Sequence, residues 1–259
     1  MLILINGSWV NREEAKVNLL SDAFMYGFGV FETLRTFGNR KVFRLKEHVD
    51  RLFASARAID LTVEYTASEI ISMVKKVVAA ADYPVQQLKI VATPEELIVI
   101  SFELTINESI YAGVSVMSIV QHRALPHVKS LSYLECFLAY REARKKGCFE
   151  ALLTDEAGYI YEGSRSNLFW FEGDTLVTRK EGVLPGITRQ VVCEISPYPV
   201  AYACITLADL TNRSEVFLSN TTRGIVPVVK IDDTVIGTGK RGENTKLLMD
   251  KYNELVSRL

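Results

Sequence analysis

Hydrophobic residues recur along this chain with two different periods, and together they predict a mixture of helices and strands. In residues 45–59, apolar side chains such as Leu52 and Ala56 return at the spacing of one helix face. Residues 67–81 follow the same period, and Pro84 lies just past their end. Short strand-like runs surround both segments and alternate with them irregularly. We therefore expect an α+β fold.

The first half of the chain is predicted to be rich in strands. Residues 1–5 form a strand that stops at the Asn6-Gly7 turn, and a short strand follows around Trp9. Further strands are expected at residues 33–37, 41–45, 87–92, 97–104 and 114–120. Residues 118–127 then lose their periodicity. We expect a smaller N-terminal α+β domain at residues 1–117, an interdomain segment at 118–127 and a larger C-terminal domain at 128–259.

The second half is predicted to open with a helix over residues 130–146. Its last turn is cationic and it stops at Gly147, which suits the helix dipole and a C-terminal glycine. Two hairpins follow, formed by residues 150–155 with 158–162 and by residues 166–171 with 175–178. A helix over 186–195, strands over 215–219 and 225–231, and a closing amphipathic helix over 244–259 complete the prediction.

Composition narrows the class of protein. The 259 residues are 48% hydrophobic and 24% charged, with a formal net charge of -1, which is typical of a globular enzyme and does not favour a nucleic-acid partner. No window of eighteen apolar residues predicts a membrane span. The three histidines and the cysteine spacing do not predict a metal site, and scattered cysteines favour a reducing, cytoplasmic setting. The cysteines are Cys136, Cys148, Cys193 and Cys204.

Four features in a fixed order carry the chemistry of this sequence. Lys129 is followed by the carboxylate of Glu162, and then by two small-polar turns at residues 186–188 and 220–222. A lysine can form a Schiff base with an aldehyde, and a carboxylate can face a pyridine nitrogen. Backbone N–H groups at a turn or helix start can bind a phosphate. The set predicts a site for pyridoxal phosphate.

Each of these residues also has a plainer interpretation. Lys129 alone would be a surface lysine, Glu162 an exposed residue at a hairpin end, and Thr188 the cap of its own helix. Arg51 could pair with Glu47 on a helix surface, although its guanidinium also suits a phosphate dianion. The order of the motifs favours the cofactor site over these separate explanations.

Together these residues resemble the fold-type IV, or class IV, pyridoxal-phosphate aminotransferases. This family includes branched-chain and D-amino acid aminotransferases and aminodeoxychorismate lyases. Residues 21–33 resemble the family's opening motif, and residues 47–52 resemble its phosphate-arginine helix. The most specific resemblance lies in residues 129–167, 186–189 and 219–227, so that nearly the whole chain is covered.

The resemblance implies a two-domain fold, a homodimer and a role for each matching residue. Lys129 would be the catalytic residue and Glu162 would face the pyridine nitrogen, with Tyr133 approaching the phenolic oxygen of the cofactor. Residues 26–31 of the partner subunit would line each active site, which places Phe31 at the substrate. The phosphate would be held by Arg51, Ile187, Thr188, Thr221 and Thr222.

Two departures from the family pattern concern the substrate. The strand at residues 87–92 lacks the usual Arg-Gly pair and long loop, and Arg165 occupies a turn position that is often small or acidic. We hypothesise that Arg165 replaces the loop as the anchor of the substrate carboxylate, with Arg35 and Arg123 as lesser candidates. The alternative is that Arg165 points to solvent or pairs with a surface acid.

The function expected from the resemblance is transfer of an amino group between an amino acid and a 2-keto acid. The mechanism would be ping-pong, with a branched-chain-like or D-amino acid-like substrate. An alternative is aminodeoxychorismate lyase, which the chain resembles in length and in residues 167–170. A non-catalytic binding protein with the same fold is a third possibility, and the complete set of cofactor residues argues against it.

Overall fold

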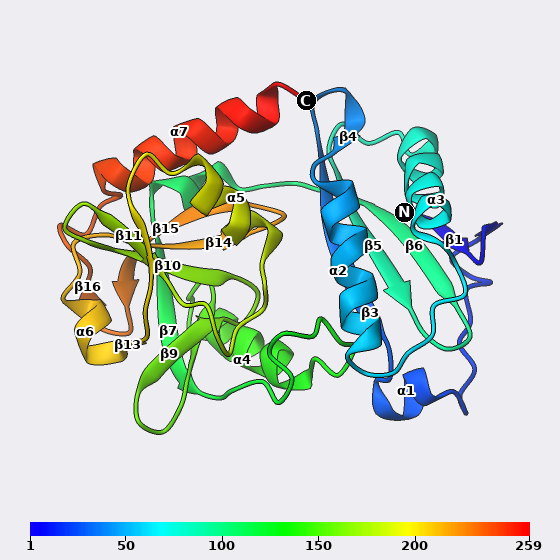
Figure 1. Ribbon diagram of the computed structural model, residues 1–259, viewed down its shortest axis with the longest axis horizontal. Coiled ribbons are helices and arrows are strands. Elements are labelled where there is room, and N and C mark those ends of the chain that lie inside the picture. The colour runs from blue at the N-terminus through cyan, green and yellow to red at the C-terminus, as the bar shows by residue number, and fades with distance from the viewer. The chain divides into compact units, whose positions relative to one another are not determined.

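The computed structural model describes all residues from Met1 to Leu259, which form two compact units (Figure 1). The first unit contains Met1–Thr105, Val128–Tyr133 and Val256–Leu259, and the second contains Ile106–His127 and Leu134–Leu255. These units do not coincide with the expected domains: residues 106–127 belong to the second unit, and residues 256–259 group with the first. Strand β7 (Val114–Val120) pairs inside the sheet of the second unit, and the segment that carries Lys129 groups with the first.

The first unit is built on a six-stranded sheet in the order β2-β1-β6-β5-β3-β4, in which every neighbouring pair is antiparallel. A short helix, α1 (Asp22–Tyr26), precedes β3, and a 3-10 turn (Gly38–Arg40) joins β3 to β4. The strands are β1 (Leu2–Ile5), β2 (Ser8–Val10), β3 (Val30–Phe37), β4 (Lys41–Val42), β5 (Gln86–Ala92) and β6 (Leu97–Glu103).

Two helices, α2 (Leu45–Arg57) and α3 (Ala67–Ala80), pack on one face of this sheet (Figure 1). The prediction of both helices from the apolar period is confirmed, and each ends one or two residues earlier than expected. Helix α3 begins at a capping box in which Thr66 and Glu69 satisfy each other's backbone N–H groups. The core between helices and sheet is closed by fully buried side chains such as Leu34 and Leu52.

Alternation along β3 and β5 divides their side chains between two faces. Leu34 and Leu88 lie in the core beneath the helices. Lys89 is paired in register with Thr33, so it lies on the opposite face, which also carries Phe31 and Arg35. This second face therefore gathers an aromatic ring and two cationic side chains.

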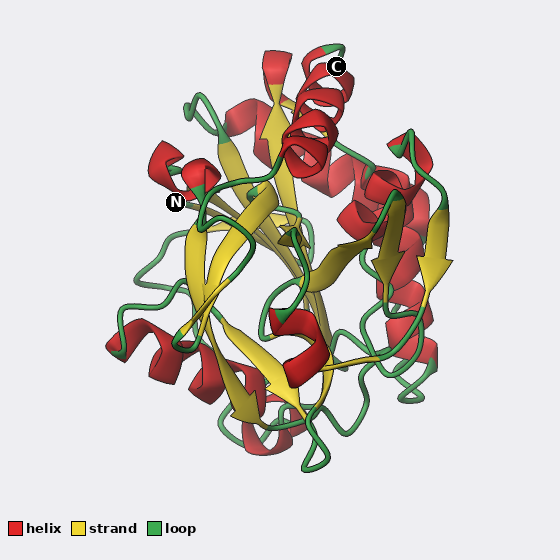
Figure 2. Cartoon of the chain, turned by 90° about the vertical axis from the view of Figure 1, so that its left-hand side faces the viewer, coloured by secondary structure: helices red, strands yellow, loops and turns green.

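The second unit contains a ten-stranded sheet with parallel and antiparallel pairs (Figure 2). Its path runs β12-β11-β10-β14-β15-β7-β8-β9-β13, with β16 paired to β15. Trp170 and Leu218 are among the fully buried side chains of its core. Besides β7, the strands are β8 (Ala151–Thr154), β9 (Tyr159–Gly163), β10 (Asn167–Glu172), β11 (Thr175–Thr178), β12 (Val200–Tyr202), β13 (Ile205–Thr206), β14 (Val216–Asn220), β15 (Gly224–Ile231) and β16 (Thr234–Val235).

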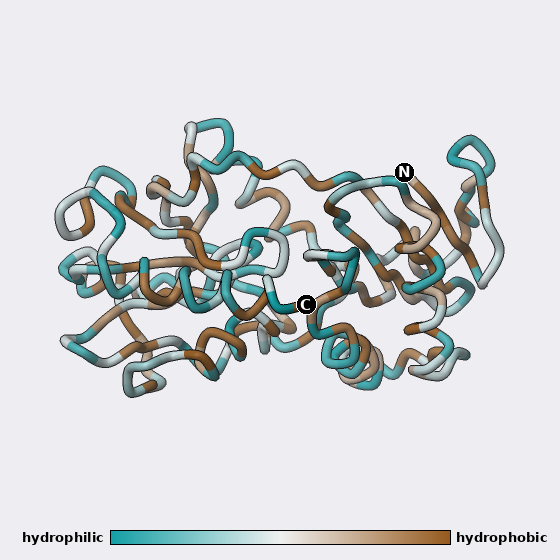
Figure 3. Tube along the Cα trace, turned by 90° about the horizontal axis from the view of Figure 1, so that it is seen from above, coloured by the Kyte–Doolittle hydropathy of each residue, from teal (hydrophilic) through white to brown (hydrophobic).

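Four helices and a 3-10 turn accompany this sheet: α4 (Leu134–Lys145), α5 (Ile187–Ile195), α6 (Leu207–Thr211), α7 (Glu243–Ser257) and the turn at Glu108–Ala112. The predicted hairpins of this half are confirmed. Figure 3 shows hydrophilic and hydrophobic segments alternating along the chain. Helix α6 and strands β12, β13 and β16 were not predicted, because such short elements show no measurable period.

The helix expected over residues 130–146 begins only at Leu134, so the prediction of its start is wrong. The preceding residues are extended because they are hydrogen-bonded to the start of β3. Ser130 bridges Val30, and the N–H of Leu131 donates to the carbonyl of Gly29 at 2.8 Å. The cationic end of the helix and the left-handed Gly147 agree with the expectation.

None of the helices is long and apolar enough to cross a membrane. The cytoplasmic location remains a prediction from the cysteine pattern.

Candidate functional site

In the first unit, Lys129 is fixed through its backbone on both sides. Its N–H donates to Ser55 Oγ at 3.2 Å, and its carbonyl accepts from the N–H of Phe31 at 2.9 Å. The side chain is half-buried, and Nζ lies 4.6 Å from the centroid of the Phe31 ring. A lysine held in this way presents its amine at a defined place on an aromatic surface.

Arg51 is held by a buried carboxylate that the sequence analysis did not single out. Its Nε and Nη2 donate to the two oxygens of Glu32 at 2.7 and 2.8 Å. The suggested partner, Glu47, pairs with Arg44 instead. This fork holds the guanidinium in one orientation, and a guanidinium suits the geometry of a phosphate.

His48 completes this buried group, since its Nδ1 lies 2.7 Å from Glu32 Oε2. Burial alone would raise the pKa of Glu32, but the charge and hydrogen bonds of Arg51, and then His48, lower it to about 2. Burial lowers the pKa of His48, against the effect of Glu32, and the charges of Arg51 and Lys129 lower it further. Glu32 is therefore ionised and accepts, while His48 is neutral and donates from Nδ1.

The ring of Phe31, which was expected at the active site of the partner subunit, contacts Lys129 and other side chains of its own chain. Tyr133 contacts it edge-on at 5.5 Å between centroids, and Lys89 Nζ lies 4.7 Å from its centroid. Arg35 lies further along β3, with Cζ 4.4 Å from the centroid of Phe37. Lys89 was missed in the sequence, although its position between the apolar Leu88 and Ile90 indicates a side chain on the face away from the core.

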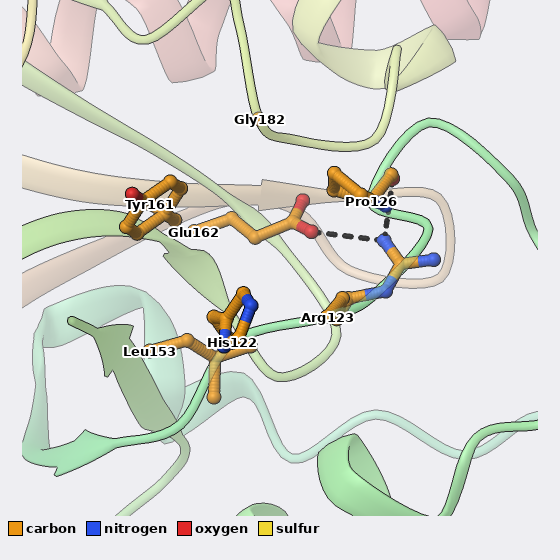
Figure 4. Close-up of a pocket in the computed structure, with 7 residues that line it drawn as sticks. All are labelled: His122, Arg123, Pro126, Leu153, Tyr161, Glu162 and Gly182. Carbon is orange, nitrogen blue, oxygen red and sulfur yellow. Dashed lines mark hydrogen bonds and ion pairs between the residues drawn. The ribbon is translucent and has the colours of Figure 1, made fainter.

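In the second unit, Glu162 lies at the end of β9 and both of its oxygens accept hydrogen bonds. Arg123 Nη1 donates to Oε1 at 2.9 Å, while Asn167 Nδ2 and the N–H of Leu184 donate to Oε2 at 3.2 and 3.0 Å. Figure 4 shows Arg123 and Glu162 pointing toward each other, with Arg123 also bound to the carbonyl of Pro126. Glu162 is thus a buried carboxylate and not an exposed hairpin residue. Arg123, a candidate for the substrate carboxylate, is bound to Glu162 in this structure.

A cavity of about 50 Å³ adjoins this pair. It is lined by His122, Arg123, Pro126, Leu153, Tyr161, Glu162 and Gly182 (Figure 4). A space of this size holds a few water molecules and is too small for an organic cofactor. The side chains of Glu162 and Arg123 thus form part of the wall of a small cavity.

The turn that follows Glu162 is organised by a second buried carboxyl, Glu150, which was also missed. Its Oε1 accepts from the backbone N–H of Arg165 and from the hydroxyls of Ser166 and Ser164, at 3.0 and 3.4 Å for the hydroxyls. Burial raises the pKa of Glu150 to about 7, against the effect of these hydrogen bonds and of nearby arginines. A Cβ on Gly163 would lie 2.6 Å from Glu150 Oε1, so only glycine fits there.

The predicted phosphate turns form a set of donors in the same unit. Helix α5 begins after Gly186, which has no side chain to cap it, so N–H groups at this helix start remain for another acceptor. Ile187 and Thr188 are buried there, and α5 packs on β14, which ends at Asn220. Asn220 Oδ1 accepts from Thr222 Oγ1 at 3.1 Å. Thr221 lies between them and is half-buried.

Two further observations agree with a phosphate site at these residues. Ser219 Oγ is buried beside this turn and has no hydrogen-bond partner in the protein. A Cβ on Gly186 would lie 1.9 Å from Asn167 Oδ1, so Asn167 links the start of α5 directly to Glu162. The turn, the helix start and the carboxylate are therefore one connected structure.

Comparison with known proteins identifies the family. A sequence model described as Amino-transferase class IV matches residues 29–231, which is most of the chain. This chain belongs to the class IV aminotransferases. A putative branched-chain-amino-acid aminotransferase of Methanocaldococcus jannaschii is 32% identical over 98% of this chain and 96% of its own. A D-alanine aminotransferase of Listeria monocytogenes serotype 1/2a is 31% identical over 100% of this chain and 97% of its own.

The fold of this class IV aminotransferase also matches solved structures. A branched-chain amino acid aminotransferase of T.th., solved with pyridoxamine 5'-phosphate, superposes with a TM-score of 0.93, at 31% identity, over 99% of this chain and 94% of that one. Class IV aminotransferases depend on pyridoxal phosphate, so the expected cofactor, enzyme class and α+β fold are confirmed. The short turn predicted after residue 92 is present, because Ala92 pairs directly with Leu97.

Proposed function

We propose that this class IV aminotransferase moves an amino group between an amino acid and a 2-keto acid by a ping-pong mechanism. The substrate would be branched-chain-like or a D-amino acid, as the names of the relatives suggest. The observation that carries the proposal is the half-buried Lys129, whose backbone is fixed by Ser55 and Phe31 and whose amine lies at the Phe31 ring. The relatives named here are aminotransferases, so the lyase alternative is not favoured.

Different residues of this chain would bind the cofactor and transfer the proton. Lys129 would hold the cofactor through its amine and move a proton to and from the substrate α-carbon. Glu162 would keep the pyridine nitrogen protonated, supported by Arg123 and Asn167. Pyridoxal phosphate, when bound, supplies the electron sink for the reaction. Tyr133 would approach its phenolic oxygen, and its phosphate would be held by Arg51, Ile187, Thr188, Thr221 and Thr222.

The second sheet face of the first unit supports a site for the substrate. Phe31, Arg35 and Lys89 lie on it together, with the amine of Lys129 at the same ring. A branched-chain-like substrate brings an apolar side chain that an aromatic ring can cover. We propose that Phe31 contacts this side chain and that Arg35 and Lys89 lie nearby on the same sheet face.

A homodimer is the proposed assembly. In the first unit, the α1 region exposes Leu20, Phe24 and Tyr26 at 84%, 57% and 73%. In the second unit, α4 exposes Leu134 and Leu138 at 65% and 52%. Clusters of large exposed apolar side chains commonly mark protein interfaces, and a second copy of this chain would cover them.

The test separates the two half-reactions. The holoenzyme is mixed with single L- and D-amino acids in the absence of any keto acid, and the cofactor spectrum and released keto acid are measured. A ping-pong aminotransferase releases one equivalent of keto acid per site, and adding a different keto acid restores the first spectrum. Continuous release of pyruvate from aminodeoxychorismate without an acceptor would instead establish the lyase. Failure of every amino acid to change the spectrum would contradict the proposal.

A further inference from the structure

Two arginines of the second unit lie around the buried Glu150. Arg165 is anchored to it, because its backbone N–H donates to Glu150 Oε1. Arg223 lies against the neighbouring residue, with Cζ 5.8 Å from the ring of Phe149. The charges of both guanidiniums act on the Glu150 carboxyl and oppose the effect of burial on its pKa. Neither arginine has a carboxylate within ion-pair distance.

The Arg165 side chain is exposed and held by stacking. Its Cζ lies 3.6 Å from the centroid of the Tyr140 ring, and its guanidinium makes no hydrogen bond to a protein acceptor. Stacking occupies a face of the planar guanidinium, whereas its N–H groups point outward in the plane. The Arg165 guanidinium is therefore oriented in advance, and its donors remain for an acceptor from outside the protein.

Arg223 is fixed more tightly, beside the turn of Thr221 and Thr222. Its N–H donates to Asn220 Oδ1 at 2.9 Å, and its carbonyl accepts from Tyr111 at 2.9 Å. Its Nη1 donates to Thr222 Oγ1 at 3.1 Å. The side chain is half-buried, so part of its charge is removed from water without a carboxylate in ion-pair contact. A guanidinium in this condition favours an anion.

We propose that Arg165 and Arg223 form a two-arginine seat for the carboxylate of the substrate. The inference rests on the proposed aminotransferase function, because that function supplies an amino acid and a keto acid as ligands. A planar carboxylate can accept two parallel hydrogen bonds from one guanidinium and a further hydrogen bond from the other. Glu150 accepts hydrogen bonds from the hydroxyls of Ser164 and Ser166 and from the Arg165 N–H, so it fixes the backbone of the turn that carries Arg165.

The experiment measures carboxylate binding separately from turnover. The holoenzyme and its Arg165→Gln and Arg223→Gln variants are titrated calorimetrically with 4-methylvalerate, a carboxylate that has no amino group to transfer. We expect each variant to bind it about 10- to 100-fold more weakly, the effect of losing a hydrogen bond to a charged group. Arg165→Lys and Arg223→Lys should recover part of the affinity, since lysine keeps the charge and loses the fork.

A matched control is Arg213→Gln, which removes the same charge from the same unit, where Arg213 already pairs with Glu172. This variant should bind 4-methylvalerate like the wild type. Thermal melting of every variant establishes that it is folded. The affinity of each apoenzyme for pyridoxal phosphate is measured in parallel, because the cofactor phosphate is the other anion that Arg223 could reach beside Thr222.

The outcomes separate the seat from the proposed function. Unchanged carboxylate affinity in the glutamine variants overturns the seat. Loss of pyridoxal phosphate affinity with unchanged carboxylate affinity also overturns it, and assigns Arg223 to the phosphate. Arginine-dependent binding of 4-methylvalerate by a protein that transaminates no amino acid keeps the seat and rejects the aminotransferase proposal.

Discussion

At the scale of single residues, the site is defined by side chains whose charge is fixed by a particular neighbour. Glu162 is held by Arg123, Asn167 and the N–H of Leu184, and Arg51 is held by Glu32. A buried charge of this kind destabilises the protein unless its partner is present, so each partner keeps the other ionised. The consequences can be measured by substitutions that remove the charge.

We predict that Lys129→Ala abolishes turnover and leaves the fold intact. Borohydride reduction of the wild-type holoenzyme should fix the cofactor mass on the peptide that contains Lys129, and the variant should show no such peptide. Lys146→Ala, an exposed lysine at the end of α4, is the control and should behave like the wild type. Cofactor mass retained on another lysine of the active variant would show that Lys129 is not the catalytic amine.

We predict that Glu162→Gln keeps the cofactor bound and slows turnover about 100-fold, or roughly 2.7 kcal/mol of transition-state stabilisation. A neutral amide cannot hold a proton on the pyridine nitrogen, although it can accept from Asn167 and Leu184. The measurement is kcat under saturating substrate. Glu156→Gln, in the exposed turn between β8 and β9, should leave kcat unchanged. Wild-type kcat in Glu162→Gln would remove Glu162 from the mechanism.

At the scale of elements, the turn between β9 and β10 determines where several predicted site residues lie. This turn includes or adjoins Gly163, Arg165 and Asn167. Glu150, just before β8, is hydrogen-bonded to the turn and holds it in place. The close packing of Gly163 against Glu150 and Ser166 leaves no space for an added atom, because these neighbouring side chains are buried and cannot move away.

We predict that Gly163→Ala destabilises the protein by about 1–3 kcal/mol, the usual effect of overpacking. Its Cβ would lie 2.3 Å from Ser166 Oγ and 2.6 Å from Glu150 Oε1. Denaturant unfolding should show the loss, accompanied by reduced affinity for pyridoxal phosphate. Gly38→Ala is the comparison, since a Cβ there meets nothing within 4 Å. Equal stability of the two variants would contradict the packing argument.

At the scale of the whole molecule, the two units respond to pH in opposite directions. In the first unit, the pKa of Glu32 is lowered from 4.5 to about 2. Its contribution to stability is present above pH 4.5 and is lost as the pH falls toward 2. In the second unit, the pKa of Glu150 is raised from 4.5 to about 7, so stability is lost as the pH rises from 4.5 through 7.

We therefore predict that the free energy of unfolding of Glu150→Gln, relative to that of the wild type, increases from pH 5 to pH 8. A shift of this size corresponds to roughly 3 kcal/mol at most, because each pKa unit is equivalent to about 1.4 kcal/mol. Denaturant unfolding at the two pH values measures it. Parallel pH dependence in the wild type and the variant would show that Glu150 is not buried as a neutral acid.

The proposed homodimer gives a second prediction at this scale. Phe24→Asp places a charge among the exposed apolar side chains of the α1 region. It should weaken self-association by at least about tenfold in analytical ultracentrifugation, because a desolvated unpaired charge opposes burial. Tyr159→Asp, an exposed aromatic on β9, is the control and should not change the sedimentation coefficient. A wild-type chain that sediments as a monomer would reject the dimer itself.

The sequence alone determined the elements whose signal is local. The apolar period located α2 and α3, and alternation located most strands, because neighbouring residues decide these patterns. The order of Lys129, Glu162 and the two turns was sufficient to predict the cofactor class, which the family confirms. These features can be predicted from the sequence because they depend only on the spacing of residues along the chain.

Only the tertiary structure decided which side chains are paired and buried. Glu32 is 19 positions from Arg51, Ser55 is 74 positions from Lys129, and Glu150 is 15 positions from the N–H that it binds. No period or motif in the sequence predicts such contacts, because they form only when separate strands and helices pack together. The extended start of the Lys129 segment has the same origin. Hydrogen bonds to the beginning of β3 override the helical pattern that residues 130–133 share with the rest of α4.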